Sequence, residues 1–152
     1  MLRALTLLMF FATSTANAVE LRGSPDEARA LAESAAEFLL QADDRHAALR
    51  EMTSPQQRFV DRDLYVFVLD LDINLLAHGA NPRIVGKNLA KMKDADGQLI
   101  SVNAVNTALD KQAGWTPRYR FPDPITKRLG VKQSYVILVE ELVVGVGFYV
   151  DS

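Results

Sequence analysis

Apolar residues recur every three or four positions from Ser24 to about Ala42, and this spacing predicts a long amphipathic helix. The helix start is well defined, because Ser24 can cap the first turn, Pro25 fits the first helical position and Glu27 can complete a capping box. The same pattern predicts a short helical restart over 46–52. The histidine of this segment, His46, follows Asp43, Asp44 and Arg45, so we expect it on the solvated face of the helix.

The pattern changes after Phe59 to that of β-strands, with runs rich in β-branched and aromatic residues separated by turn residues. These runs predict five antiparallel strands, at 64–70, 74–78, 114–121, 132–140 and 142–150. The first and the last runs are apolar on both faces, so both sides of the sheet must be covered. We expect the long helix on one side and the segment after Asn81 on the other.

The second covering layer should contain a helix over 98–111, capped by Asp96 and stopped by Gly114. The fold class is therefore α+β, with a long N-terminal helix packed on a five-stranded antiparallel sheet and short helices on the other face. Gly145 and Gly147 interrupt the last strand, and either a bulge or the close approach of neighbouring atoms would explain them.

The N-terminal residues have the pattern of a signal peptide. Arg3 precedes the apolar run 5–12, and Ala16-Asn17-Ala18 suits cleavage near Ala18. We therefore expect a signal peptide over 1–18, a single domain over 19–152 and a periplasmic or secreted protein. Loss of Arg3 leaves 16 of the 17 basic side chains against 19 acidic ones, a formal charge of −3. This balance gives no reason to expect nucleic acid as a partner.

Metal binding and catalysis find little support in the sequence. Asp70, Asp72 and Asn74 have the spacing of a calcium loop, but Leu75 stands where glycine is needed and Asn81 where a carboxylate is needed. A hairpin turn explains them better. The chain has no cysteine, nucleophile elbow, zinc-protease motif or phosphate loop. We expect no metal, no cofactor and no enzyme activity.

Short motifs distributed along the chain follow one order and spacing. They are Tyr65 with the strand to Asp70, Ala77-His78, Asn81-Pro82, Gly86-Lys87, Lys93-Asp94, Asp96-Gly97, Gly114-Trp115, Tyr119-Arg120, Pro122, Pro124, Ser134-Tyr135 and Val144-Gly145. From about Ser24 to its end, the chain resembles the single-Cache group of extracytoplasmic ligand-binding modules. The resemblance implies a PAS-like fold with a small-molecule cavity.

The resemblance also implies a ligand, since single-Cache relatives typically bind short carboxylates of two to four carbons. A buried carboxylate needs a fixed cation and hydrogen-bond donors. Three cations are candidates for that role: Arg120, Lys132 and Lys87. The candidate hydroxyl donors are Tyr65, Tyr119 and Tyr135.

Two further residues complete the candidate site. Trp115 is expected as a cavity wall, and His78 either donates to the carboxylate or holds the Asn81 loop through its backbone. Alternation places Trp115, Tyr119 and Phe121 on one face of their strand and the arginines on the other. Alternation alone leaves open which face is the core.

Three functional hypotheses remain open from the sequence. The leading one is a free-standing sensor that binds a small organic acid and acts through a separate membrane receptor, kinase or transporter. The second is a structural or protein-interaction module whose pocket is closed, and the third and weakest is an enzyme. A homodimer through the N-terminal helix is a further expectation.

Overall fold

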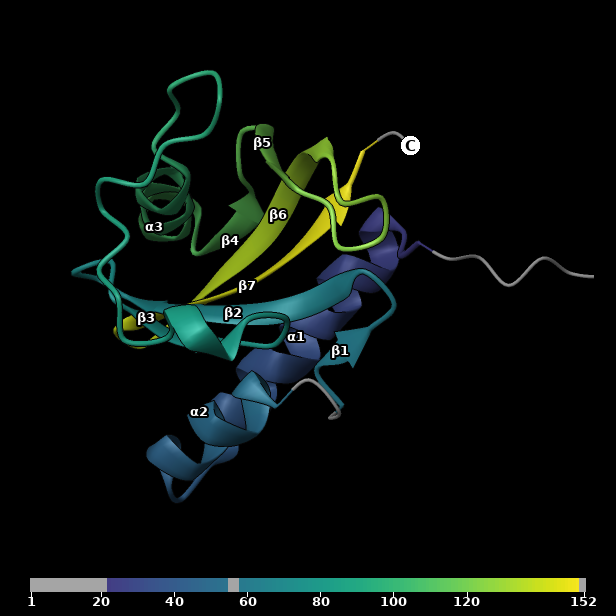
Figure 1. Cartoon of the computed structure of the whole chain (residues 1–152). Coiled ribbons are helices and arrows are strands. Elements are labelled where there is room, and N and C mark those ends of the chain that lie inside the picture. Colours follow the sequence, from purple (N-terminus) through teal and green to yellow (C-terminus); the bar gives the residue numbers. More distant parts are fainter. Residues whose placement is uncertain (1–21, 55–57, 151–152) are drawn as a thin grey trace, which may run out of the picture.

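The computed structural model describes residues 22–54 and 58–150, so the predicted signal peptide and its cleavage site lie outside the described residues. Within this part of the chain, seven strands form one antiparallel sheet (Figure 1). The strands are β1 Val60–Asp61, β2 Leu64–Asp70, β3 Leu75–His78, β4 Ala113–Trp115, β5 Tyr119–Pro122, β6 Leu129–Val139 and β7 Leu142–Tyr149. The path runs β1-β2-β7-β6-β4, with β3 beside β2 and β5 beside β6.

Helices cover both faces of this sheet, as predicted (Figure 1). Helices α1 (Pro25–Gln41) and α2 (Arg45–Thr53) pack on one face. Helix α3 (Ile100–Lys111) packs on the other, together with the segment 79–99, which contains the short 3-10 helix η1 (Pro82–Ile84). We call residues 79–99 the roof segment. The α+β class is confirmed, and every helix of the described residues is too short or too polar to span a membrane.

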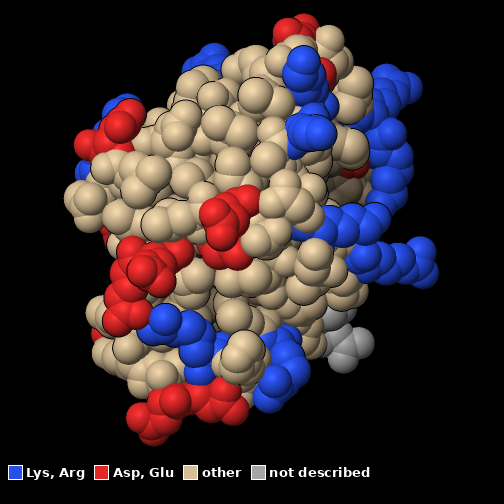
Figure 2. Space-filling view, turned by 90° about the vertical axis from the view of Figure 1, so that its left-hand side faces the viewer, with Lys and Arg blue, Asp and Glu red and all other residues tan. Residues whose placement is uncertain are grey.

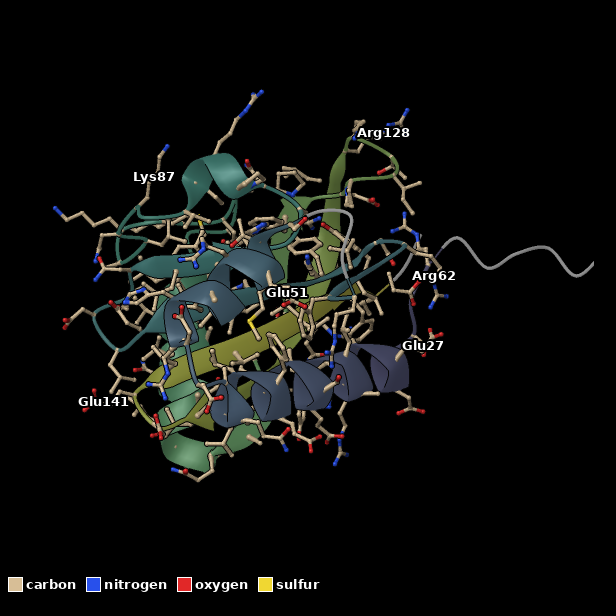
Figure 3. The ribbon with its side chains drawn as sticks, turned by 90° about the horizontal axis from the view of Figure 1, so that it is seen from below. Glu27, Glu51, Arg62, Lys87, Arg128 and Glu141 are labelled. Carbon is tan, nitrogen blue, oxygen red and sulfur yellow. The ribbon has the colours of Figure 1, made fainter. Side chains whose placement is uncertain are left out.

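The start of α1 forms the predicted capping box. Ser24 Oγ accepts the Glu27 N–H at 3.2 Å, and Glu27 Oε2 accepts the Ser24 N–H at 2.7 Å. These bonds satisfy backbone donors that a helix start leaves unpaired. The other Glu27 oxygen lies 2.6 Å from Arg62, so the first turn of α1 is tied to the β1–β2 turn (Figure 3).

The predicted strand 114–121 is two strands, because the chain leaves the sheet between β4 and β5 at Thr116-Pro117-Arg118. Proline cannot donate to a strand ladder, which accounts for the break. Trp115 and Tyr119 therefore do not share a face. Alternation across the break fails because the two strands pair with different stretches of β6.

The predicted end of α3 at residue 111 is confirmed, but the helix begins two residues later than predicted and both predicted capping residues are wrong. Asp96 does not cap the helix, which begins after Leu99 without a side-chain cap. The carboxylate of Asp94 instead accepts the N–H groups of Asp96 and Gln98 and shapes the preceding turn. The last helical residue is Lys111, and Gln112 is the C-cap. Gln112 has a left-handed φ of 63° and donates its N–H to the Ala108 carbonyl, so Gly114 is not the residue that stops the helix.

The predicted hairpin turn at 70–74 is present. Asp70 Oδ1 accepts the Asn74 N–H at 2.8 Å, and Asp70 Oδ2 accepts the Asn74 side-chain amide at 2.8 Å. The side chains that suggested a calcium loop thus hold the turn between β2 and β3.

The central strands divide their side chains strictly between the two layers. In β2, Leu64, Val66 and Val68 pack toward α1 and α2, whereas Tyr65, Phe67 and Leu69 face α3 and the roof segment. The same alternation runs through β6 and β7, so each face of the sheet has its own core. The face beneath the roof segment contains both polar groups and glycines.

Close packing explains the two glycines of β7. The strands β6 and β7 pair without a register shift, so neither glycine marks a bulge. A Cβ atom at Gly145 would lie 2.3 Å from the Phe67 ring, and one at Gly147 would lie 2.4 Å from Lys132 Cε. No side chain fits at either position without moving its neighbour.

We expect Gly145→Ala to destabilise the fold by about 1–3 kcal/mol, because the added methyl group would force the Phe67 ring out of its place. Chemical denaturation would measure the change in the free energy of unfolding. Glu141→Ala, at the exposed tip of the same hairpin, should change it by less than about 0.5 kcal/mol. Equal stabilities for Gly145→Ala and the wild type would show that the ring has room to move.

Candidate ligand-binding cavity

A small cavity lies between the sheet and the layer formed by α3 and the roof segment, with a volume of about 60 Å³. Its lining divides by chemistry into two groups. The polar group is Tyr65, His78, Ser101, Thr116, Tyr119, Lys132 and Ser134. The apolar group is Phe67, Leu69, Leu75, Ile84, Leu89, Met92, Ile100, Ala104 and Phe121. Strands form the floor and sides, and α3 and the roof segment close the top.

Lys132 of β6 is the cation of the cavity, and only 2% of it is exposed. Its Nζ donates to the Tyr65 hydroxyl at 2.7 Å. The rings of Tyr65, Tyr149 and Phe121 surround the amine at 3.9, 4.9 and 5.3 Å from Nζ to the ring centroids. Aromatic faces attract a cation but replace only part of the water that it has lost.

The sheet register creates the space that this lysine occupies. Lys132 pairs directly with Tyr119 on β5 and with Tyr149 on β7, so a tyrosine flanks it on each side. Two residues along β7 stands Gly147, whose missing side chain leaves room for the lysine stem. Lys132 can therefore extend across the floor of the cavity instead of leaving it.

The nearest acidic side chains are occupied by another cation. Arg22 bridges Asp63 and Asp123 at 3.2 and 2.6 Å, and both carboxylates are buried. Burial opposes the charge of Asp123, yet bonds from Arg22 and from two backbone N–H groups lower its pKa to about 2. Among the described residues, no carboxylate lies within salt-bridge distance of Lys132. Burial lowers the pKa of Lys132 to about 7, although Asp63 and Asp123 raise it in part.

His78 faces the cavity because of a β-bulge. Leu75 pairs with Leu69 and His78 pairs with Phe67, and the register shifts at the extra residue Leu76 between them. Strict alternation from Leu75 would have turned His78 toward α2; the bulge turns it back. Its ring lies 4.8 Å from that of Tyr65.

The two ring nitrogens of His78 have separate roles. Nδ1 accepts the Asn81 N–H at 2.9 Å, which holds the start of the roof segment and leaves Nε2 to carry the proton. Burial and the charge of Lys132 lower the pKa of His78 to about 4, so the ring is neutral near pH 7. The predicted loop-holding role is present, and it leaves one N–H donor on the ring.

Tyr119 and Ser134 form the other polar wall. Their hydroxyls lie 2.7 Å apart, and Thr116 Oγ1 accepts the Ser134 N–H at 3.2 Å. Burial raises the pKa of Tyr119 to about 12, so its hydroxyl stays protonated. The cavity thus combines one cation, neutral hydroxyl groups and a neutral imidazole.

The structure brings four of the eight predicted site residues into this cavity: Tyr65, His78, Tyr119 and Lys132. The other four lie elsewhere. Arg120 points to solvent and bonds to Asp96 at 3.2 Å, because it alternates with Tyr119 along β5. Lys87 is exposed on the outer side of the roof segment (Figure 3).

Trp115 and Tyr135 pack on the opposite face of the sheet. Their ring centroids are 5.0 Å apart, and Arg29 of α1 lies over the Tyr135 ring. Tyr135 lies three positions after Lys132 on one strand, so the two side chains must point to opposite faces. Both aromatic residues belong to the core beneath α1.

Several cavity residues were not singled out from the sequence as site residues, including Phe67, Thr116, Phe121 and Ser134. Two of them carried a usable signal. Phe67 follows Tyr65 by two residues and Ser134 follows Lys132 by two, so each shares a face with a residue that was predicted. Nothing local to Thr116 indicates that it closes the side wall.

Two other recesses lie near the cavity. One of about 220 Å³ lies outside it and shares Tyr65, His78, Ile84 and Phe121, so these four residues separate the cavity from its outer approach. A wider recess of about 430 Å³ lies between α2 and the roof segment. Its basic residues, His46 and Arg50, are exposed. We place the candidate site in the smaller cavity because it alone of the three contains a buried cation.

Burial of the Lys132 amine should make the stability of the fold depend on pH. The pKa of Lys132 is about 7 in the folded protein and 10.5 when unperturbed, so the unfolded chain binds more protons between these values. The free energy of unfolding should therefore gain up to about 1.4 kcal/mol per pH unit from this group as pH rises from 7 to 9.5. Lys132→Met should lack this gain and should be more stable than the wild type at pH 6.

Urea denaturation at pH 6, 7, 8 and 9.5 would measure this difference. Lys87→Met removes an exposed lysine and should retain the wild-type dependence on pH. Parallel stability curves for the wild type and Lys132→Met would contradict the buried state of the amine.

The chain matches the family described as Single Cache domain 2 over residues 14–152. It is 32% identical over 94 residues to the methyl-accepting chemotaxis protein McpP of Pseudomonas putida. It is also 32% identical over 93 residues to the sensor histidine kinase MctS of Rhizobium johnstonii. Each match covers 60% of this chain but only 17% and 20% of the two relatives, so the matched part is about a fifth of their length.

Solved structures share the architecture. A Cache chemosensory domain described for carboxylic acid recognition has a TM-score of 0.70 and 27% identity, over 83% of this chain and 92% of that one. The periplasmic sensor domain of a chemotaxis protein has a TM-score of 0.64 and 28% identity, over 83% and 90% of the two chains. With the family match over most of its length, the chain belongs to the Single Cache domain 2 family of extracytoplasmic sensor modules, whose members bind ligands instead of catalysing reactions.

Proposed function

We propose that the cavity binds a short monocarboxylic acid of two to four carbons, with its carboxylate at Lys132. The observation that carries this proposal is a buried lysine amine that has no acidic partner within residues 22–54 and 58–150, in a small and otherwise largely apolar cavity. A buried cation is unfavourable unless it is paired. A ligand carboxylate would supply the missing charge.

The polar end has the donors that a carboxylate requires. Lys132 Nζ has three N–H groups, and its one hydrogen bond among the described residues goes to Tyr65. The remaining N–H groups, the Nε2–H of His78 and the Tyr119 hydroxyl can converge on one carboxylate. Bonds between charged donors and acceptors are stronger than those between neutral groups.

The size of the cavity favours the smallest acids. A volume of about 60 Å³, at about 10–15 Å³ for each water-sized occupant, corresponds to about four to six non-hydrogen atoms. Acetate, propionate, lactate, pyruvate and butyrate fall in this range. A ceiling of about 1.5 kcal/mol per atom limits propionate to about micromolar affinity.

The opposite end of the cavity selects against a second charge. The lining beyond Lys132 contains no second cation, since Leu69, Leu75, Leu89 and Ala104 are apolar and Ser101 of α3 supplies only a neutral hydroxyl. A dicarboxylate would bury an unpaired anion there, which is unfavourable. An alkyl tail would instead gain from leaving water.

The surface above the cavity is suited to an anionic ligand. The roof segment has four exposed basic residues, Arg83, Lys87, Lys91 and Lys93. Figure 2 shows basic side chains gathered along one edge of the molecule, with a few acidic groups beside them at its upper end. A positive surface raises the local concentration of anions. The related Cache chemosensory domain described for carboxylic acid recognition is further support.

The proposal extends to location and signalling. We propose that the domain acts in the periplasm and that its ligand-bound state is read by a separate membrane receptor, kinase or transporter. Relatives with this domain include a chemotaxis receptor and a histidine kinase, which supports a signalling context. Pairing of two copies through α1 is part of the same proposal.

Binding can be tested by thermal shift and calorimetry against acetate, propionate, butyrate, lactate, pyruvate and succinate. A ligand at 100 times its Kd stabilises the folded state by about 2.7 kcal/mol, which corresponds to a rise in Tm of about 5–10 °C. We expect propionate or acetate to give the largest rise and succinate to give none.

Matched variants locate the site. Lys132→Met should abolish binding and Tyr65→Phe should weaken it about tenfold, because the first removes the cation and the second a hydroxyl that positions it. Arg120→Ala and Lys87→Met, both at exposed positions, should bind like the wild type. A panel without any response would favour an interaction module whose cavity takes no ligand.

A further inference from the structure

The empty cavity stabilises the protonated form of the Lys132 amine poorly. Strand β2 contributes Tyr65, β5 contributes Tyr119 and Phe121, β7 contributes Tyr149, and β3 contributes His78. None of these side chains is an anion at neutral pH. A buried ammonium surrounded by neutral groups tends to lose its proton.

The charged groups behind this shell compensate only in part. Arg22, Asp63 and Asp123 together have one net negative charge, and Arg22 and Lys132 both lie over the Tyr149 ring. This charge attracts the lysine from beyond hydrogen-bonding distance. Both carboxylates accept hydrogen bonds from Arg22 and from backbone N–H groups. The full counter-charge is missing until an anion enters the cavity.

We propose that the acid binds together with a proton that Lys132 takes up, so that the cavity senses a carboxylate and acidity jointly. The proposal rests on the carboxylate function above and adds a condition to it. The ligand enters as a carboxylate anion, and the Lys132 amine takes up a proton from solvent to become an ammonium. The two charges then pair inside the cavity, where neither would be stable alone.

The direction of the effect follows from linkage. The pKa of Lys132 is about 7 in the empty cavity, and a bound carboxylate raises it. Well below pH 7 the lysine is already protonated, and affinity is independent of pH. Above pH 7 each binding event must first take up a proton, so the association constant falls by up to about tenfold per pH unit.

Other groups do not reproduce this dependence. The pKa of His78 is about 4 and that of Tyr119 about 12, while burial raises the pKa values of Tyr65 and Tyr149 above their usual range. The direct hydrogen bonds of Asp123 hold its pKa at about 2. Among these groups around the cavity, Lys132 is the one that titrates between pH 6 and 8.

Isothermal titration calorimetry with propionate tests the proposal directly. Titrations are run at pH 6 in phosphate and in Bis-Tris and at pH 8 in phosphate and in Tris, because the different heats of ionisation of the two buffers in each pair reveal proton uptake. We expect about 0.1 proton taken up per propionate at pH 6, about 0.9 at pH 8, and an affinity about tenfold weaker at pH 8.

The possible results separate this proposal from the function on which it rests. Equal affinity at both pH values, with heats independent of the buffer, overturns proton uptake and leaves carboxylate binding intact. No binding of propionate or acetate at either pH overturns the proposed function itself. Weaker binding at pH 8 with buffer-dependent heats supports both.

A second pair of measurements assigns the proton to Lys132. Lys132→Arg keeps a cation that does not titrate in this range, so any binding that it retains should be equally strong at pH 6 and pH 8. Binding by this variant that still weakens at pH 8 overturns the assignment. Carbon NMR of the lysine side chains in the free wild type should show one signal titrating near pH 7 that is missing from Lys132→Met, and its absence from the wild type also overturns it.

Discussion

Desolvation of one lysine amine determines the arrangement of the sheet face beneath the roof segment. Lys132 can stay inside because Gly147 leaves space beside its stem, and because the rings of Tyr65, Tyr149 and Phe121 replace part of the water around its head group. The same requirement leaves the cavity lined by hydroxyls and rings instead of carboxylates. An acidic neighbour would stabilise the lysine permanently and would compete with any anionic ligand.

Alternation along the strands accounts for much of what the sequence could predict. Tyr65 and Lys132 were identified as candidates, and the structure joins them through a hydrogen bond across two strands that are not adjacent. Counting in twos along β6 would also have excluded Tyr135 as a partner of Lys132. The odd spacing between Lys132 and Tyr135 is therefore enough to assign the two side chains to opposite faces of the sheet.

Irregular backbone is where prediction from sequence fails. Pro117 divides one predicted strand into two, which sends Trp115 and Tyr119 to opposite faces. The bulge at Leu76 brings His78 into the cavity, and no residue type at that position announces it. The predicted cap of α3 is wrong for a similar reason, because the carboxylate of Asp94 forms the turn before the helix by accepting the N–H groups of Gln98 and of Arg120 on β5. Each of these outcomes depends on pairing with distant segments.

Tyr149 joins the cavity to the beginning of α1. Its ring lies close to both Lys132 and Arg22, and Arg22, three residues before α1, bridges Asp63 and Asp123. Its hydroxyl also donates to the carbonyl of Pro122, at the end of β5. Neutralising a charge inside the cavity therefore changes the electrostatic environment of Arg22, which contacts the same aromatic ring shortly before α1 begins. Tyr149 thus places the charge inside the cavity next to the ion pairs that hold the segment before α1 to the sheet.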